Sequence, residues 1–208
     1  EKALGGVRKT YCMDDHTYYA HDRVLTTPSY TAYTRIGEGC EIGPNAMVRD
    51  CIVGKDTTIN ASQVNESSIG SHTTVGPFTY VRPNCRIGDH CRVGDFVEVK
   101  NSVIGDGTKI SHLTYVGDSD VGQRVNFGCG TVTTNYDGHK KHRCTIGDDV
   151  FLGCNTNLIA PVTVADRAYT AAGSTVTDDV PEGALAIARQ RQTNIRGWAD
   201  RLRKTWKK

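Results

Sequence analysis

Aliphatic residues recur every six positions through most of this chain. From Ile69 to Val99 the period is uninterrupted, and glycine often follows the aliphatic residue, as in Ile69-Gly70 and Val93-Gly94. A period of six matches neither the 3.6-residue repeat of an amphipathic helix nor the alternation of a half-buried strand. It predicts a short strand followed by a turn, repeated, with the aliphatic side chain inside and glycine or polar residues at the corner. The other blocks that keep the period contain Ile36, Ile42, Val48; Ile104, Ile110, Val116; and Ile146, Leu152, Leu158, Val164, Thr170, Val176.

Three such hexads close one triangular coil of about eighteen residues, so the chain is predicted to be an all-β solenoid of parallel strands. Stacked coils pair their backbones at about 4.8 Å, as neighbouring strands do in any sheet. The stability of such a stack is a sum of contacts between adjacent coils. Residues about eighteen positions apart should therefore lie above one another on the same wall.

Three segments depart from the repeat. Residues 1–34 are irregular and rich in Tyr and His, and we expect a distorted first coil there; the β-helix should span 35–189. Within it, NYDGHKKHRC contains an Asp-Gly turn signal and five residues without an aliphatic, which predicts a protruding loop over about 134–145. Residues 190–208 lose the hexads and place Ile195, Trp198, Leu202 and Trp206 at helical spacing. We expect a short basic helix that covers the open end or side of the solenoid, or a neighbouring subunit.

Composition narrows the cellular context. The chain has 25 Lys and Arg against 23 Asp and Glu, and eight cysteines with no CxxC pair. Without such a pair or a secretory leader, we interpret the cysteines as reduced thiols of a cytoplasmic protein and expect no metal site. No apolar run is long enough to cross a bilayer. The last twenty residues hold eight Lys and Arg against one Asp. We interpret this basic tail as a solvated helix, and we expect no nucleic-acid or membrane partner.

The eighteen-residue spacing between stacked coils points to two cations as candidate ligand-binding residues. Arg82 and Lys100 each follow an inward residue and are eighteen apart, so they should lie one above the other. Like charges this close repel, by up to about 1 kcal/mol in water at 4 Å, and an anion between them would reverse the sign. A phosphate is the natural ligand for an Arg and a Lys together. The alternative is that both side chains point into solvent and avoid each other.

The next coil contributes a candidate base. His112 lies two residues after the inward Ile110, on an outward part of the hexad, and its imidazole exchanges protons near neutrality. Glu98 lies one coil below Tyr115, and a carboxylate near the histidine would orient its ring. The loop adds Asn135 and Tyr136 as hydrogen-bonding groups and Lys141 as a third cation, because loops on a rigid repeat tend to carry binding residues.

The stretches GPFTYVRP, GDFVEVK, SHLTYVGD, GTVTTNYDG, IGDDVFLG, LIAPVTVADRA and ALAIARQRQ, in this order, resemble the acetyltransferase domain of bacterial bifunctional N-acetylglucosamine-1-phosphate uridyltransferase/glucosamine-1-phosphate acetyltransferases. The resemblance covers about residues 34–191, and HLTYVGD together with TNYDG is its most specific part. It implies a left-handed parallel β-helix, an exception to the usual right-handed crossover. It also implies acetyl transfer from acetyl-CoA to glucosamine 1-phosphate for cell-wall precursor synthesis, in a homotrimer with active sites at subunit interfaces.

The resemblance assigns expected roles to the positions of this sequence that match the family's site residues. The resemblance implies His112 as general base; the supporting role of Glu98 rests on the coil spacing above. The sugar phosphate would be bound by Arg82, Lys100, Tyr115, Asn126 and Lys141, and the acetyl group and nucleophile would lie by Asn135 and Tyr136. Acetyl-CoA would be contacted by Cys154, Ala172 and Arg189. The family usually has serine where this chain has Cys154, and a thiol is the weaker hydrogen-bond donor.

Other functions stay open at this point. A hexapeptide acyltransferase with another amino-sugar acceptor would share the pattern. A γ-type carbonic anhydrase shares the prism but binds metal with three histidines, and His112, His139 and His142 lack that spacing. A binding solenoid without catalysis is the third alternative. Because the sequence contains no Gly-rich phosphate loop of a nucleotidyltransferase, we expect acetyl transfer without synthesis of the nucleotide sugar.

Overall fold

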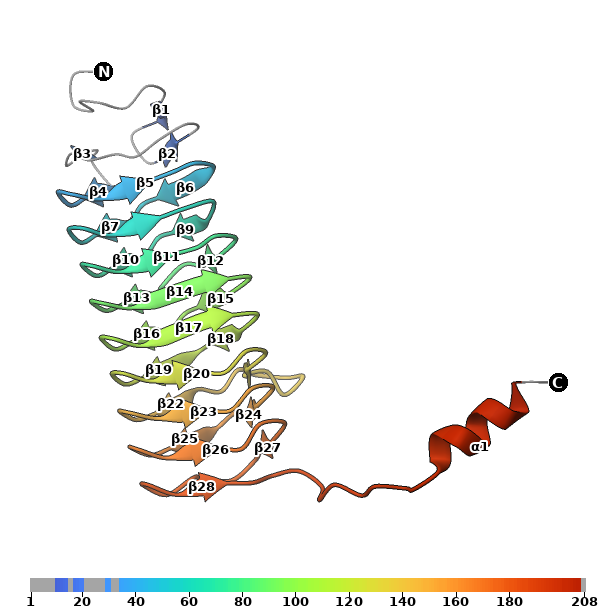
Figure 1. The fold of residues 1–208 in the computed structure, drawn as a ribbon. Helices are drawn as coiled ribbons and strands as arrows, with labels where there is room; N and C mark the ends of the chain where they lie inside the picture. Colours follow the sequence, from blue (N-terminus) through green and yellow to red (C-terminus); the bar gives the residue numbers. More distant parts are fainter. Residues whose placement is uncertain (1–9, 15–16, 21–28, 31–33, 207–208) are drawn as a thin grey trace.

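The computed structural model is a three-walled parallel β-solenoid followed by an extended segment and one short helix (Figure 1). It describes residues 10–14, 17–20, 29–30 and 34–206. Each coil contributes one strand to each of three walls. The predicted parallel solenoid of hexapeptide repeats is therefore confirmed, whereas its left-handed sense stays a prediction.

The first wall is a ten-stranded sheet. In spatial order it contains β1 (Thr10–Asp14), β2 (Thr17–Ala20), β6 (Ala46–Arg49), β9 (Gln63–Asn65), β12 (Tyr80–Val81), β15 (Glu98–Lys100), β18 (Tyr115–Gly117), β21 (Val132–Thr134), β24 (Asn157–Ile159) and β27 (Thr175–Val176). The hairpin β1–β2 joins this wall antiparallel to β6. Within the segment 1–34, β1 and β2 thus extend this sheet as a hairpin and Ser29–Tyr30 pair antiparallel with β4 (Arg35–Ile36) in the second wall, while residues 1–9, 15–16, 21–28 and 31–33 lie outside the described residues.

The second and third walls have nine strands each. The second contains β3 (Ser29–Tyr30), β4 (Arg35–Ile36), β7 (Ile52–Val53), β10 (Ser68–Ile69), β13 (Arg86–Ile87), β16 (Val103–Ile104), β19 (Ser119–Val121), β22 (Cys144–Ile146) and β25 (Val162–Val164). The third contains β5 (Glu41–Ile42), β8 (Thr58–Ile59), β11 (Thr74–Val75), β14 (Arg92–Asp95), β17 (Lys109–His112), β20 (Asn126–Phe127), β23 (Phe151–Leu152), β26 (Tyr169–Thr170) and β28 (Leu185–Ala186).

The predicted inward positions form the core. Every hexad residue named above is at most 3% exposed, including Thr170. Neighbouring coils pair in register, for example Val81 with Val99 in the first wall. Each wall therefore stacks one column of aliphatic side chains against the other two, and burial of these columns stabilises the prism by roughly 25 cal/mol per Å² of apolar surface.

The corners between walls use left-handed backbone. Between the third and first walls, the residue at the turn has a positive φ in five successive coils: Phe96, Leu113, Gly130, Asn155 and Gly173. The position just before this turn therefore recurs once in each coil. These corners are where outward side chains from different coils are brought into one column.

The predicted loop leaves the stack between Thr134, the end of β21, and Cys144, the start of β22 (Figure 1). It is internally braced. Tyr136 and Lys141 form an antiparallel bridge, and the Asp137 carboxylate accepts hydrogen bonds from the backbone N–H groups of His139 and Lys140. These bonds, with that to His142, lower the pKa of Asp137 to about 2. These internal hydrogen bonds therefore give the loop a defined conformation.

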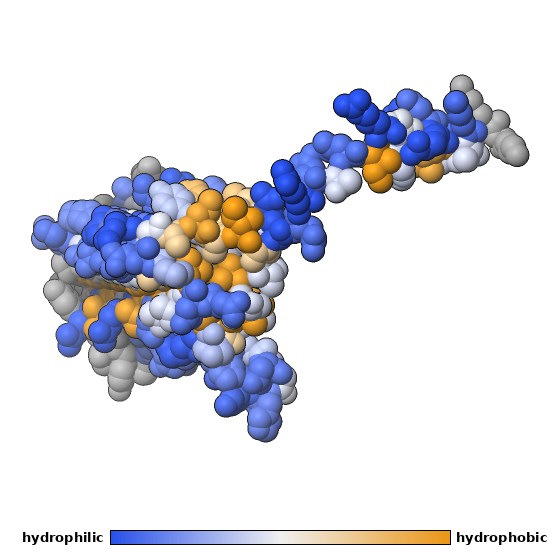
Figure 2. Space-filling view, turned by 90° about the horizontal axis from the view of Figure 1, so that it is seen from below, coloured by the Kyte–Doolittle hydropathy of each residue, from blue (hydrophilic) through white to orange (hydrophobic). Residues whose placement is uncertain are grey.

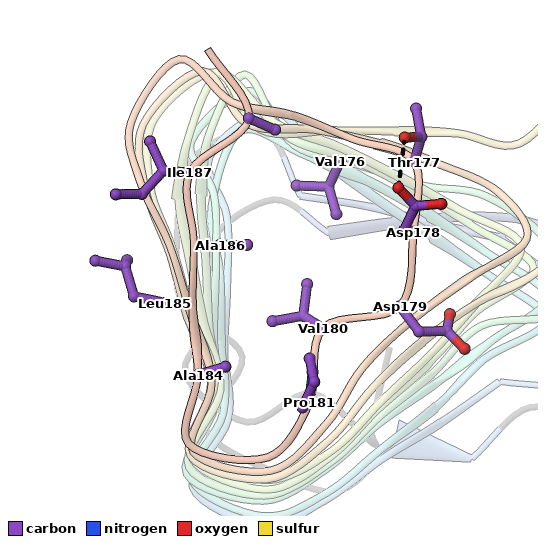
Figure 3. Close-up of a pocket in the computed structure, with 11 residues that line it drawn as sticks. Val176, Thr177, Asp178, Asp179, Val180, Pro181, Ala184, Leu185, Ala186 and Ile187 are labelled. Atoms are coloured by element: carbon purple, nitrogen blue, oxygen red, sulfur yellow. Dashed lines mark hydrogen bonds between the residues drawn. The ribbon is translucent and has the colours of Figure 1, made fainter. Parts of the chain in front are cut away.

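The C-terminal segment contains a helix within the predicted tail. The helix α1 spans Trp198–Thr205, shorter than the predicted stripe, and projects away from the solenoid with no buried residue (Figure 1). It covers neither the end nor a side of its own prism, and its contact with a neighbouring subunit stays a prediction. That open end displays an apolar patch when viewed from below (Figure 2). Val176 and Val180 point into the triangular interior there (Figure 3).

Of the residues that the structure describes, none belongs to a helix that is both long and apolar enough to span a membrane.

Candidate active site

Three cations converge where the first wall turns into the second. The register of β12 and β15 places Lys100 one coil beyond Arg82, and the loop brings Lys141 to the same place. Together with Pro83, Asn84, Asn101 and Asp118 they line a cleft of about 400 Å³. We call Arg82, Lys100, Asn101, Asp118 and Lys141 the cation corner.

The charges at the cation corner oppose one another. The nearby ammonium of Lys141 lowers the pKa of Lys100, desolvation lowers it further, and the Asp118 carboxylate partly offsets both effects. On the neighbouring strand, Arg82 donates to Glu98 at 2.9 Å, which raises the pKa of the guanidinium. Like charges gathered at one cleft favour an anion, because a bound anion replaces repulsion between cations by attraction.

Asp118 is held as part of the wall rather than as a free counter-ion. The side-chain amides of Asn101 and Asn135 donate to its two carboxylate oxygens. Burial alone would raise the pKa of Asp118, but these two amides, with Lys100 and Lys141, lower it. Its charge is therefore stabilised by two neutral amides as well as by Lys100 and Lys141. Because Arg82 pairs with Glu98, the three cations exceed their two nearby carboxylates by one charge, which favours binding of an external anion.

Tyr115 links this corner to the wall. Its ring lies over Gly117, where an added Cβ would be 2.3 Å from the phenol oxygen, so a larger residue at that position would displace the Tyr115 ring. The Asn135 amide approaches the Tyr115 hydroxyl at 3.4 Å. The predicted residues Tyr115 and Asn135 therefore meet beside Asp118.

The loop is anchored over the cation corner by its last residues. Arg143 makes a two-point ion pair with Asp120 of β19, at 2.6 and 2.8 Å, and donates to the Asn101 carbonyl at 3.1 Å. The backbone N–H of His142 bonds to the carbonyl of Asn135. These bonds fix the base of the loop that carries Lys141. Tyr136, by contrast, is 57% exposed and donates to the carbonyl of Gly138.

His112 lies at the other edge of the first wall, where the third wall turns into it. It ends β17, its side chain is half exposed, and Nδ1 is 4.0 Å from the Asp95 carboxylate on the adjacent coil. Glu98 was expected near this histidine, but its carboxylate is bound to Arg82 instead. The reason is register: Glu98 pairs with Tyr115, whereas the residue that pairs with His112 is Asp95.

The coils beyond His112 repeat the same corner position. The N–H of Gly130 approaches the His112 carbonyl at 3.4 Å, that of Asn155 bonds to the Cys129 carbonyl at 2.8 Å, and that of Gly173 bonds to the Cys154 carbonyl at 2.8 Å. We call the column Asp95, His112, Cys129, Cys154 and Ala172 the histidine corner. Arg189 lies at its far end, since a Cβ at Gly173 would be 3.7 Å from Cδ of Arg189.

The structure does not gather all the predicted residues within one chain. Asn126 lies in the third wall, in register with Lys109 and Phe151. Neither it nor Tyr136 lines the cation cleft. Three residues near the site were missed from the sequence: Asp95, Asn101 and Asp118. Coil arithmetic would have found them, because each lies seventeen residues from a residue already selected or from another of the three.

The described residues include no group of three or more His, Cys, Asp and Glu side chains placed to hold a metal ion. His139 and His142 lie in the loop, with His142 bound to Asp137 at 2.7 Å. The arrangement of donors within residues 34–206 therefore gives no support to the carbonic anhydrase alternative.

Comparison with known proteins agrees with the repeat. Residues 66–101 match the family description "Bacterial transferase hexapeptide (six repeats)". The chain is 56% identical over 168 residues to "Bifunctional protein GlmU" of Clostridium beijerinckii, covering 81% of this chain and 37% of that protein. It is 62% identical over 166 residues to the GlmU of Oceanobacillus iheyensis, covering 80% and 36%. This chain is a hexapeptide-repeat homologue of GlmU. The resemblance found in the sequence is confirmed, and the chain spans little more than a third of the length of these relatives.

Solved structures share the fold. A mutant perosamine N-acetyltransferase of Caulobacter crescentus, in complex with CoA and GDP-perosamine, is 26% identical with a TM-score of 0.50, covering 56% of this chain and 53% of that one. An Arabidopsis UDP-N-acetylglucosamine acyltransferase has a TM-score of 0.55 at 16% identity, covering 76% and 62%. The second likeness supports the solenoid fold alone.

Proposed function

We propose that the chain transfers the acetyl group of acetyl-CoA to the amine of glucosamine 1-phosphate, giving N-acetylglucosamine 1-phosphate. The observation that carries this is the cation corner, where Arg82, Lys100 and Lys141 line one cleft. The relationship to GlmU, at 56% identity, supports the sugar phosphate as the anion. Binding the phosphate at one edge of the first wall would leave the rest of the sugar to extend along Tyr115 toward the other edge.

His112 would act as general base. Glucosamine 1-phosphate carries an ammonium at neutral pH, and only the free amine attacks a thioester carbonyl. Neutral His112 would accept the proton as the C–N bond forms, a contribution of typically 10²- to 10⁴-fold. The tetrahedral oxyanion then collapses and the coenzyme thiolate leaves. Asp95, 4.0 Å from Nδ1, is the carboxylate placed to orient the ring.

Acetyl-CoA would lie along the histidine corner. Cys154 and Ala172 continue the column from His112, and Arg189 at its far end would meet a phosphate of the coenzyme. The likeness to an N-acetyltransferase whose structure holds CoA supports this choice of donor. The thioester carbon would then be delivered beside His112, while the sugar is held from the opposite edge of the wall.

A homotrimer would complete the site. Asn126 lies in the third wall and does not line the cation cleft of its own chain, so we expect it to reach a shared ligand from a neighbouring copy. Beside His112, the corner residues Phe78, Phe96 and Leu113 form an apolar ridge in which each side chain is at least 59% exposed, and the two Phe rings stack at 5.4 Å. All three have the positive φ that the corners of this solenoid share, which turns their side chains outward at successive coils. The ridge is the surface we expect a second subunit to bury.

The ridge can be tested by charge insertion. Phe96→Asp should dissociate the trimer, since burying an unpaired carboxylate against an apolar partner is costly. Ile52→Asp, at an equally exposed aliphatic residue of the second wall, is the matched control and should leave the assembly intact. Sedimentation equilibrium measures both. A Phe96→Asp protein that stays trimeric would exclude this ridge from the interface.

Acceptor choice decides the function itself. We propose a cytoplasmic enzyme of cell-wall precursor synthesis, consistent with reduced thiols and a soluble sugar phosphate. An amino-sugar nucleotide acceptor is the second candidate, because the perosamine acetyltransferase holds GDP-perosamine. Release of free coenzyme thiol should be compared across glucosamine 1-phosphate, glucosamine and a nucleotide-linked amino sugar. Glucosamine 1-phosphate should give the highest kcat/KM. A higher value for the nucleotide sugar would replace the proposal.

A further inference from the structure

We propose that Cys129 and Cys154 form a dithiol site that is oxidised to an intramolecular disulfide. The two residues hold the same corner position in adjacent coils, since β20 pairs in register with β23 and the N–H of Asn155 bonds to the Cys129 carbonyl. Adjacent coils are about 4.8 Å apart, which is inside the range of roughly 4.4–6.8 Å that the Cα atoms of a disulfide require.

The site differs from the other cysteines that the structure describes. Cys40, Cys51, Cys85, Cys91 and Cys144 are buried inside the prism, each at most 4% exposed. Burial raises the pKa of the Cys51 thiol to about 12 and that of Cys144 to about 11, so these thiols stay protonated and unreactive. Cys129 is half-buried and Cys154 is exposed.

Register also separates the buried cysteines from one another. Cys51 and Cys85 face the same column, but Ser67 lies between them, as the hydrogen bond from the Cys85 N–H to the Ser67 hydroxyl shows. Among the cysteines whose side chains the structure describes, Cys129 and Cys154 are the pair in adjacent coils at one corner. Accessibility and register therefore select the same two thiols.

The chemical step needs a two-electron oxidant, and a hydroperoxide suffices. The exposed Cys154 thiolate attacks a peroxide oxygen, the O–O bond breaks, and a sulfenic acid forms with release of water or an alcohol. The Cys129 thiol then attacks the Cys154 sulfur, the S–O bond breaks, the S–S bond forms and water leaves. Two thiols are oxidised by two electrons, and the peroxide is reduced.

A disulfide at this point would alter the histidine corner. Cys129 directly follows His112 in the column, and Cys154 is the position at which we expect the acetyl donor. The consequence for activity rests on the proposed function: the bridge draws the Cys154 side chain toward its neighbour and closes the surface along which the coenzyme thioester would approach. Oxidation would then stop acetyl transfer, and a reductant would restore it.

The test treats the whole chain with hydrogen peroxide and maps cysteines by mass spectrometry, in parallel with acetyl transfer. We expect a peptide pair joined through Cys129 and Cys154, together with a loss of transfer that dithiothreitol reverses. Cys129→Ser removes the resolving thiol, and its transfer after peroxide is compared with its own untreated value. After peroxide it should give a sulfenic acid at Cys154 that dimedone traps, with no joined peptides.

The outcomes separate the two proposals. Peroxide-treated protein in which Cys129 and Cys154 both stay reduced, or are joined only to other chains, overturns the dithiol site. A joined pair with unchanged transfer supports the dithiol and contradicts the placement of acetyl-CoA at the histidine corner. An equal loss of transfer in Cys129→Ser would contradict the effect of the bridge on activity, because oxidation of Cys154 alone would then account for the loss.

Discussion

The two edges of the first wall are built from the same repeat but carry different chemistry. At the cation corner, Arg82 and Lys100 follow inward valines, and short polar residues such as Asn101 and Asp118 occupy the turns. At the histidine corner, the outward column holds an imidazole, two thiols and a carboxylate. The cation corner is suited to bind an anion, and the histidine corner is suited to accept a proton and to bind a thioester.

The difference shows how a repeat protein separates stability from function. The inward residues of both edges are equivalent: Val81, Val99 and Val116 are fully buried and interchangeable in role. The outward residues one or two positions later are free to vary because they do not enter the core. A site can therefore be divided along one wall, with binding at one edge and chemistry at the other, without changing the fold.

The largest expected effect is at the histidine corner. His112→Ala should lower kcat by about 10²- to 10⁴-fold, because general base catalysis is lost, while leaving KM for the sugar phosphate nearly unchanged. His90→Ala, at an exposed histidine of another corner that stacks on His72, is the matched control and should keep full activity. Steady-state kinetics distinguishes them. Unchanged kcat in His112→Ala would remove the chemistry from that edge.

Substitutions at the cation corner should change KM rather than kcat. Arg82→Ala and Lys100→Ala should each raise KM for the sugar phosphate by about 10- to 150-fold, the value of a charge-assisted hydrogen bond of roughly 1.5–3 kcal/mol. Arg92→Ala, at an exposed arginine of the third wall, should have no effect. Equal losses in kcat without a change in KM would show that the two edges are not separate in function.

Substitutions of Asp95 and Glu98 should also distinguish the histidine corner from the cation corner. Asp95→Asn should lower kcat only a few-fold, since exposed pairs such as that with His112 are worth about 0.2–1 kcal/mol. Glu98→Gln should instead lower KM, because it frees Arg82 from a competing carboxylate. If Glu98→Gln lowers kcat and Asp95→Asn does not, the original expectation that Glu98 supports His112 would be restored.

The smallest effect concerns pH. Lys141 lowers the pKa of Lys100, so Lys100 loses its proton, and the cleft loses anion affinity, at a lower pH than for an ordinary lysine. Lys141→Gln should raise the pKa of Lys100 and shift the alkaline rise in KM to higher pH, although KM at neutral pH increases. Measuring KM across alkaline pH checks this. If KM rose at the same pH in the unchanged chain and in Lys141→Gln, the effect of Lys141 on the pKa of Lys100 would be contradicted.

Much of the molecule followed from the six-residue period. The period located the inward residues, the parallel walls, and the loop after Thr134 where it fails. It also placed Lys100 one coil beyond Arg82, because both lie in an uninterrupted run of hexads. These features depend on local spacing alone, which the sequence contains in full.

Features that depend on coil length were harder to predict. A one-residue slip after Val99 shortens the coil to seventeen residues, and this places Asp95, not Glu98, beside His112. The hydrogen bonds of Asp118 join residues seventeen positions apart, which a strict eighteen-residue coil misses. The ion pair of Arg143 with Asp120 spans the loop, where no period applies. The position of α1 was also missed, since an apolar helical stripe predicts a helix but not the surface that it contacts.

The division of labour between the two edges is tested most directly by a crystal structure with glucosamine 1-phosphate and the coenzyme bound. We expect the phosphate within hydrogen-bonding distance of the Arg82 guanidinium and the Lys100 ammonium, and the sugar amine facing the His112 imidazole. A phosphate bound away from those two cations, or an amine turned away from His112, would contradict the account.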